Sequence, residues 1–188
     1  MSLKDLINNS RSDKNTTHSY LDLYQKLLIH KKDTAKNVLE IGVWDGGSIK
    51  LWYDFFTNAT VYGLDIIPIQ QVWHELKNND RIKIYTSIDA YNEEFFTNTF
   101  LNQNIKFDFM LDDGPHTIES MIKFIQLYSQ IISNNGILII EDVQSMEWLD
   151  ILSDATPEHL KQYIKTYDLR SNKGRYDDIV FTIDKSNI

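Results

Sequence analysis

The sequence has 188 residues, and its 19 Lys and Arg against 27 Asp and Glu give a formal net charge of −8. This length fits one domain, so we expect residues 1–188 to form a single domain. The chain has no cysteine, which excludes disulfide scaffolds, cysteine-ligated metal sites and thiol nucleophiles. The acidic balance argues against nucleic acid as a partner, because neutralising phosphates requires clustered Lys and Arg.

The sequence shows no targeting or membrane signal. Residues 1–6 lack the apolar core of a signal peptide. Apolar runs such as residues 137–140 are far shorter than the roughly 20 residues that a membrane span requires. We therefore expect a cytoplasmic protein with no membrane span.

Helical and extended patterns alternate along the chain. Apolar side chains at helical spacing predict a helix over residues 17–32. Short apolar runs predict strands at residues 37–43, 60–66, 81–86, 107–113 and 137–143. Between the strands we expect a helix capped by Ser48, a helix that begins at Pro68, and helices over residues 91–102 and 117–133.

Five apolar strands that alternate with helices predict a parallel sheet covered on both faces. The end of the chain differs, since residues 163–169 and 178–183 are strand patterns around a Gly-containing turn at 171–175. This arrangement predicts an antiparallel hairpin. The expected fold class is therefore α/β: a doubly wound, Rossmann-like, mostly parallel seven-stranded sheet with a C-terminal antiparallel hairpin.

Acidic residues stand at the ends of four of the five predicted parallel strands. Ligands of such sheets bind beyond the carboxyl ends of the strands, so these side chains are the first candidates for a site. Gathered carboxylates repel one another unless positive charge lies among them. The acidic residues in question are Glu40, Asp65, Asp112, Asp113, Glu141 and Asp142.

The loop after the first strand contains Gly42, Gly46 and Gly47 and leads into Ser48. Glycines allow the backbone to pass close to a ligand at the start of a helix. Asp65, at the end of the next strand, can accept hydrogen bonds from ribose hydroxyls. Alone, each element is also typical of an ordinary turn or a surface acid; together they favour a nucleoside-type ligand.

Several motifs carry a resemblance to a known family. Residues 38–48 with Asp65 resemble the class I S-adenosylmethionine-dependent methyltransferases. Residues 111–116 (Leu-Asp-Asp-Gly-Pro-His) and 139–142 (Ile-Ile-Glu-Asp) resemble metal-dependent sugar O-methyltransferases that act on macrolide antibiotics, and their smaller bacterial relatives. Two further blocks, residues 12–20 and 168–178, are similar to segments of those small relatives.

The resemblance implies a fold, a reaction and a set of site residues. It implies methylation of a sugar hydroxyl on a small molecule or glycan, with S-adenosylmethionine as cofactor and Mg²⁺ as metal. Asp113, Glu141 and Asp142 would hold the ion, and His116 would be the general base beside Asp113. The cofactor-binding residues would be Glu40, Gly42, Gly46, Ser48, Asp65, Asp89 and Asp112.

Some of these residues have a structural alternative. Asp13, Lys14 and His18 either cap the first helix or, as the resemblance implies, belong to a helical lid formed by residues 1–33. The Glu141–Asp142 pair also fits a solvated strand end. For Arg170, Arg175 and Asp177 we favour salt bridges of the hairpin over catalysis.

The sequence departs from the family pattern in three places. Pro115 stands where the small relatives have Ser, so it fixes the backbone before His116 and removes a donor. Residues 87–90 are less polar than expected where Asp89 or a nearby backbone group would contact adenine. The resemblance does not extend to the large N-terminal extension of the macrolide enzymes, so substrate size and a homo-oligomeric state are left open.

Three other functions stay open at this point. The first is methylation of a non-sugar hydroxyl such as a catechol. The second is a non-catalytic S-adenosylmethionine-binding partner protein, against which the intact Asp113, His116, Glu141 and Asp142 argue. A dehydrogenase is disfavoured because the glycine spacing is not that of a dinucleotide-binding loop.

Overall fold

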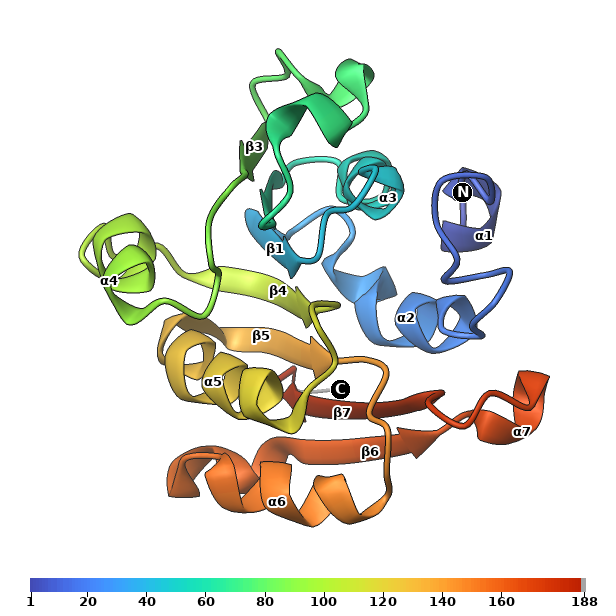
Figure 1. Ribbon diagram of the computed structural model, residues 1–188, viewed down its shortest axis with the longest axis vertical. Coiled ribbons are helices and arrows are strands. Elements are labelled where there is room, and N and C mark those ends of the chain that lie inside the picture. Colours follow the sequence, from blue (N-terminus) through green and yellow to red (C-terminus); the bar gives the residue numbers. More distant parts are fainter. Residues whose placement is uncertain (187–188) are drawn as a thin grey trace.

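The computed structural model describes residues 1–186 and contains one seven-stranded sheet (Figure 1). The strand order is β3-β2-β1-β4-β5-β7-β6. The first five strands run parallel, and β7 runs antiparallel to both β5 and β6. The predicted doubly wound sheet with a C-terminal hairpin is confirmed. The strands are β1 (Asn37–Ile41), β2 (Thr60–Leu64), β3 (Ile82–Tyr85), β4 (Phe107–Asp112), β5 (Ile132–Ile140), β6 (Ile164–Asp168) and β7 (Ile179–Asp184).

Helices cover both faces of the sheet (Figure 1). One face packs against α1 (Leu3–Leu6), α2 (Leu21–Leu28) and α3 (Gly47–Phe55). The other packs against α4 (Glu93–Phe96), α5 (Ile118–Tyr128) and α6 (Glu147–Ala155). Successive strand residues alternate between the two cores, as Val38 and Leu39 do in β1. This two-sided burial explains why the strands read as continuous apolar runs.

Several predicted helices differ from the observed ones. The helix predicted over residues 17–32 is α2 followed by a 3₁₀ turn at Ile29–Lys31. The α-helix predicted to begin at Pro68 is not present in the described structure. Two 3₁₀ turns, Ile69–Gln71 and His74–Leu76, connect β2 to β3 instead. This connection buries only Val72 and Leu76 fully, which is too little apolar surface to stabilise a longer helix.

Other helices begin or end at residues that differ from the predicted ones. Ser48 does not cap α3, because Gly46 adopts a left-handed conformation (φ 95°) and the helix begins at Gly47. The helix predicted to run to residue 133 ends earlier, and β5 already begins at Ile132. The predicted helix at 91–102 is α4 continued by a π-helical turn, Thr97–Leu101. Helices α1, α6 and α7 (Arg170–Lys173) were not predicted.

Left-handed backbone conformations gather at the carboxyl ends of the parallel strands. Two glycines and Trp44 adopt them after β1, Ser87 after β3, His116 after β4 and Asp142 after β5. A side chain rarely tolerates such a conformation unless its surroundings enforce it, and strain of this kind is concentrated at functional sites. The backbone thus marks the same edge of the sheet as the acidic residues.

No helix within residues 1–186 combines the length and the apolar character that crossing a membrane would require.

Gly42 is the tightest backbone contact at this edge, and its replacement gives the first testable prediction. At Gly42 (φ 93°), an added Cβ would lie 1.9 Å from the carbonyl oxygen of Asp113. Gly174→Ala is a matched control, because Gly174 (φ 71°) has no atom within 4 Å of such a Cβ among the described residues. We expect Gly174→Ala to cost about 1 kcal/mol of unfolding free energy and Gly42→Ala at least about 3 kcal/mol.

Urea denaturation measures both values. Equal losses in the two variants would mean that only the left-handed conformation matters and that the contact with Asp113 is not a constraint.

Candidate cofactor and metal site

A cavity of about 510 Å³ opens at the carboxyl ends of β1, β2 and β4. Gly42 and Asp65 line it, together with Asp89 and Tyr91 from the connection after β3. Asp113 lines the side that faces β5, and the exposed Trp44 lies at the mouth. A cavity of this size, with a few polar groups among apolar walls, fits a small-molecule ligand of nucleoside size.

Asp65 organises the glycine loop from the end of β2. Its Oδ2 accepts hydrogen bonds from the backbone N–H groups of Val43 (2.7 Å) and Trp44 (2.8 Å). Its Oδ1 accepts from the N–H of Ile67 at 3.1 Å. The carboxylate therefore fixes the loop and still lines the cavity, where its oxygens have further acceptor capacity.

Glu40 lies behind the cavity and does not line it. Its side chain is fully buried, and its Oε2 accepts a hydrogen bond from the indole N–H of Trp52 at 2.8 Å. Its Oε1 accepts no hydrogen bond from the residues that the structure describes. Burial raises the pKa of Glu40 to about 7, although the nearby Lys14 opposes the shift.

Asp112 is buried behind the cavity wall and is linked to it through Tyr91. The Tyr91 hydroxyl donates a hydrogen bond to Oδ1 of Asp112 at 2.5 Å. Gly114 makes room for this pair, since a Cβ there would lie 2.1 Å from the Tyr91 hydroxyl. Gly46 and Ser48 are also buried and do not line the cavity. Of the predicted cofactor-binding residues, the cavity walls include Gly42, Asp65 and Asp89.

A compact acidic group with one histidine adjoins the cavity at β4 and β5. Asp113, His116 and Asp142 each offer a ligand atom, and these atoms all lie within 4.8 Å of one another. Nε2 of His116 is 3.7 Å from Oδ1 of Asp113 and 3.6 Å from Oδ2 of Asp142. Carboxylate oxygens that converge in this way are suited to Mg²⁺.

Glu141, the third predicted metal ligand, faces a different partner. Its side chain is fully buried, one oxygen accepts from the Lys14 ammonium, and the other accepts from the Tyr24 hydroxyl. Burial raises the pKa of Glu141 well above its usual range, with the neighbouring Asp113 adding to the shift and Lys14 opposing it. Glu141 thus shares the Lys14 ammonium with Asp113, and its role as a metal ligand stays a prediction.

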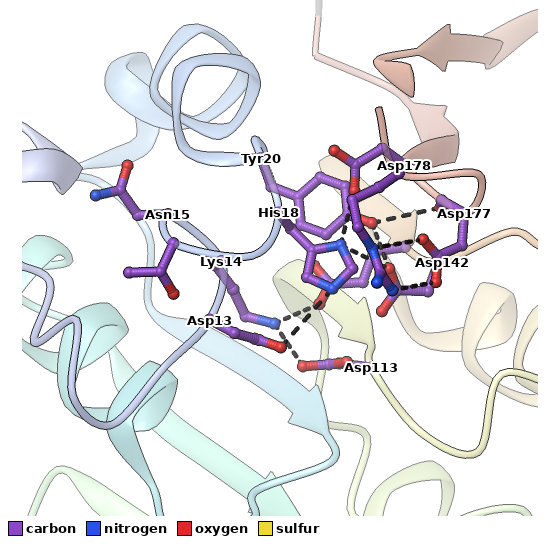
Figure 2. Close-up of polar contacts among 12 residues, drawn as sticks. Asp13, Lys14, Asn15, His18, Tyr20, Asp113, Asp142, Asp177 and Asp178 are labelled. Carbon is purple, nitrogen blue, oxygen red and sulfur yellow. Dashed lines mark hydrogen bonds and ion pairs between the residues drawn. The ribbon is translucent and has the colours of Figure 1, made fainter. Parts of the chain in front are cut away.

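The segment between α1 and α2 crosses this edge of the sheet (Figure 2). Lys14 Nζ is 2.5 Å from Oδ2 of Asp113 and 3.4 Å from Oε1 of Glu40. Burial alone would lower the pKa of Lys14, but the surrounding carboxylates outweigh burial and raise it well above its ordinary value. Lys14 is therefore a fixed cation.

His18 and Tyr20 attach the same segment to the neighbouring loops. Nδ1 of His18 is 2.7 Å from Oδ1 of Asp178 and 3.3 Å from Oδ1 of Asp142 (Figure 2). The Tyr20 hydroxyl donates a hydrogen bond to Oδ1 of Asp142. Burial raises the pKa of Asp142, although the hydrogen bond from Tyr20 acts in the opposite direction.

The segment with Asp13, Lys14 and His18 does not have the helix-capping role that was one of its two predicted alternatives. None of Asp13, Lys14 and His18 caps α2, whose N-cap is Tyr20, without a side-chain hydrogen bond. Within residues 1–33, α1 and α2 pack into the core, while an irregular segment crosses the rim and Asp13 lines the cavity, so the lid stays a prediction. The predicted salt bridges of the hairpin are present, as Arg170–Asp168 and Arg175–Asp177.

Sequence reasoning did not assign Lys14, Tyr20 and Tyr24 to the carboxylates that they contact. Two of them belong to a block, residues 12–20, whose resemblance to the small relatives was the available signal. The sequence pattern predicts Tyr24 only as one of the buried residues of α2. The structure shows that its hydroxyl also donates a hydrogen bond to Glu141.

Comparisons with known proteins agree with this geometry, although no protein-family model matches the sequence. The chain is 28% identical over 150 residues to mycinamicin VI 2''-O-methyltransferase of Micromonospora griseorubida, which covers 75% of this chain and 35% of that protein. It is 24% identical over 147 residues to demethylmacrocin O-methyltransferase of Streptomyces fradiae, covering 74% of this chain and 35% of that protein. The chain thus spans about a third of the length of these curated relatives.

A solved structure, MycE methyltransferase from the mycinamycin pathway in complex with Mg and SAH, matches with a TM-score of 0.76. The match covers all of this chain and 55% of that one, at 22% identity. The chain is thus similar in sequence to these O-methyltransferases. Its fold is that of the class I S-adenosylmethionine-dependent methyltransferases, and the cavity and the acidic group lie at the edge of the sheet where ligands of such folds bind.

Asp112 gives a prediction for pH dependence in this methyltransferase fold. Burial raises the pKa of Asp112 to about 7, and the hydrogen bond from Tyr91 opposes the shift. A carboxyl whose folded pKa exceeds its unfolded value stabilises the fold at low pH, and this stability is lost as the pH rises through the folded pKa. We expect Asp112→Asn to remove that loss and to gain about 2.6 kcal/mol relative to the wild type between pH 5 and pH 8.

Urea denaturation at both pH values, with circular dichroism as the signal, measures this difference. A free-energy difference between variant and wild type that stays constant with pH would show that Asp112 ionises in the folded protein as it does in the unfolded chain.

Proposed function

We propose that the protein is an S-adenosylmethionine-dependent O-methyltransferase that methylates a sugar hydroxyl with the help of Mg²⁺. The observation that carries the proposal is the position of Asp113. This residue lines the cavity and also belongs to the group of Asp113, His116 and Asp142. A cofactor in the cavity and an ion at the acidic group would therefore be neighbours, as a transfer between cofactor and ion-bound acceptor requires.

The cavity fits the cofactor in its chemistry as well as its size. Gly42 brings the backbone to the cavity wall without a side chain, and Asp65 offers acceptors at the end of β2. The exposed Trp44 and the half-buried Tyr91 provide aromatic surface for the adenosyl part. The similarity to O-methyltransferases, and to a solved structure that contains Mg, SAH and mycinamycin VI, supports the assignment.

The acidic group fits a hard divalent ion. We assign the ion to Asp113 and Asp142, while the predicted third ligand, Glu141, is engaged by Lys14 and Tyr24. When bound, Mg²⁺ supplies Lewis-acid chemistry that makes an acceptor hydroxyl easier to deprotonate.

We assign the role of general base to His116. The transfer forms one bond between the acceptor oxygen and the methyl carbon and breaks the bond between that carbon and sulfur. One proton, from the hydroxyl, must then be removed, and we assign it to Nε2 of His116. Asp113 and Asp142 lie 3.6–3.7 Å from this atom, so the base adjoins the carboxylates that would hold the ion.

Three further statements stay predictions from the sequence. These are the cytoplasmic location, the lack of nucleic acid as a partner, and the oligomeric state. The acceptor is a nucleotide-linked sugar, a surface glycan or a glycosylated natural product, and its identity is open to experiment.

Calorimetric titration tests the cofactor assignment directly. We expect S-adenosylmethionine and S-adenosylhomocysteine to bind the folded protein with a stoichiometry of about one per chain, and NAD not to bind. The titrations are made with and without Mg²⁺, and methyl transfer to a panel of sugars is then measured. A folded sample that binds neither compound would contradict the proposed function.

His116 gives a second prediction for turnover. We expect His116→Ala to lower kcat by about 10²–10⁴-fold, because it removes only the group that accepts the proton. Its affinity for S-adenosylhomocysteine should stay within about twofold of the wild type, since His116 does not line the cavity. The exposed His159, substituted by Ala, is the matched control and should leave both values unchanged. Turnover of His116→Ala at the wild-type rate would show that another group is the base.

A further inference from the structure

The connection between β6 and β7, residues 169–178, lies at the same edge of the sheet as the cavity and the acidic group. Strand β7 runs antiparallel to β5 and to β6, so β6 ends and β7 begins at the carboxyl ends of the parallel strands. In the strand order, β7 and β6 follow β5 on the side away from β1 and β2. The edge therefore carries the cavity, then the acidic group at β4 and β5, and then the β6–β7 connection with α7 (Figure 1).

The geometry of methyl transfer determines on which side of the cofactor the acceptor lies. The acceptor oxygen must approach the methyl carbon from the side opposite to sulfur, so acceptor and cofactor extend in opposite directions from the reacting atoms. With the proposed cofactor in the cavity and the reacting hydroxyl at the acidic group, the rest of the acceptor extends away from β1 and β2. The edge of the sheet continues in that direction with the β6–β7 connection.

The β6–β7 connection adjoins the acidic group through two shared contacts. The Tyr20 hydroxyl, which donates a hydrogen bond to Asp142, is 3.5 Å from the carbonyl oxygen of Asp177. Nδ1 of His18 lies between Oδ1 of Asp178 at 2.7 Å and Oδ1 of Asp142 at 3.3 Å. Carboxylate oxygens of Asp177 and Asp178 lie within 4.8 Å of one of Asp142. A ligand at the acidic group would therefore also reach this connection.

Contacts with the segment between α1 and α2 fix the conformation of the β6–β7 connection. Nζ of Lys173 donates hydrogen bonds to the carbonyl oxygens of Asn15 at 2.5 Å and Thr16 at 2.8 Å. Asp178 is fully buried, and its Oδ2 accepts a hydrogen bond from the Ser19 hydroxyl at 3.0 Å. A surface that is fixed in this way loses little conformational freedom when a ligand binds.

Two side chains of the connection are available to a ligand. Tyr176 is 62% exposed, and the guanidinium of Arg175 lies 6.0 Å from the centroid of its ring. Arg175 binds Asp177 through Nε at 3.1 Å and Nη2 at 2.8 Å, which leaves the donors of Nη1 for a ligand. An aromatic ring beside such donors suits a sugar, because a sugar presents both C–H groups and hydroxyls.

We propose that Tyr176 is an acceptor-binding residue, whose ring packs against the nonpolar face of the acceptor sugar while Arg175 donates hydrogen bonds to hydroxyls of that sugar. The inference rests on the proposed function, and it adds the surface on which the acceptor is recognised. Asp177 already neutralises Arg175, so the pair suits the uncharged ring of a sugar better than a phosphate.

The test measures sugar binding directly, by saturation-transfer difference NMR in the presence of S-adenosylhomocysteine and Mg²⁺. The probes are the methyl glycosides of glucose, galactose, mannose and rhamnose. The wild type is compared with Tyr176→Ala, Tyr176→Phe and Arg175→Lys. Ile29→Ala is the control, because Ile29 is also an exposed apolar residue (47%) but lies in the turn after α2. KM and kcat are then measured for methyl transfer to the glycoside that binds most tightly.

We expect the wild type to bind at least one glycoside, with the strongest saturation on C–H protons of one face of the sugar ring. Tyr176→Ala should raise Kd at least about tenfold, while Tyr176→Phe, which keeps the ring, should stay within about twofold. Arg175→Lys keeps the charge beside Asp177 but lacks Nη1, so it should raise Kd about threefold. Ile29→Ala should match the wild type.

The kinetic constants separate acceptor binding from a structural role. In Tyr176→Ala, KM should rise with Kd while kcat stays within about twofold, because the contact is the same in the ground state and the transition state. The affinity for S-adenosylhomocysteine should not change, since Tyr176 does not line the cavity.

Three results would overturn the inference. These are wild-type glycoside affinity in Tyr176→Ala, a fall in kcat at unchanged KM in that variant, and a wild type that binds S-adenosylhomocysteine but none of the four glycosides. A wild type that binds a glycoside through Tyr176 but does not bind S-adenosylhomocysteine would contradict only the proposed function.

Discussion

The burial of several carboxylates at one end of a parallel sheet is the constraint on which the rest of this structure depends. Glu40 and Glu141 are fully buried at the carboxyl ends of β1 and β5, on either side of β4, and burying each carboxylate would be costly without a partner. The chain supplies those partners from outside the sheet, through Lys14, Tyr24 and the indole of Trp52. The first 24 residues are therefore part of the site as much as of the core, because the segment that follows α1 brings the cation and α2 brings the hydroxyl.

The same edge also concentrates backbone strain. Trp44, His116 and Asp142 all have positive φ angles, although none is a glycine. Each lies two to four residues after the end of a parallel strand, where the chain turns above the sheet. Such conformations persist only where the surroundings enforce them, and here Asp65, Lys14 and Tyr20 bind the loops or the carboxylates concerned. One network of polar contacts thus holds the strained loops and also compensates the buried carboxylates.

The sequence predicts the sheet well because the physics of its strands is local. A strand buried on both faces is a short apolar run, and residues 137–140 are an example. Helix α6 was not predicted, although its apolar residues have helical spacing; only Leu152 in it is fully buried. Lys14 could not be assigned either, since Asp113 and Glu141 lie 99 and 127 residues further along the chain. The sheet topology alone predicts that the acidic residues at the strand ends lie close together. Which Lys or Arg pairs with which carboxylate depends on tertiary packing.

Asp113 makes the cavity and the acidic group parts of one site. Its N–H donates to the carbonyl of Ile41 at 2.9 Å, and its own carbonyl lies against Gly42, so its backbone is fixed to the loop that lines the cavity. Its carboxylate is shared between Lys14 and the space in front of His116. A ligand that binds in the cavity and moves Asp113 therefore also changes the geometry of the acidic group. Linkage makes the effect reciprocal, so an ion that orders the Asp113 carboxylate changes cofactor affinity by the same factor as the cofactor changes affinity for the ion.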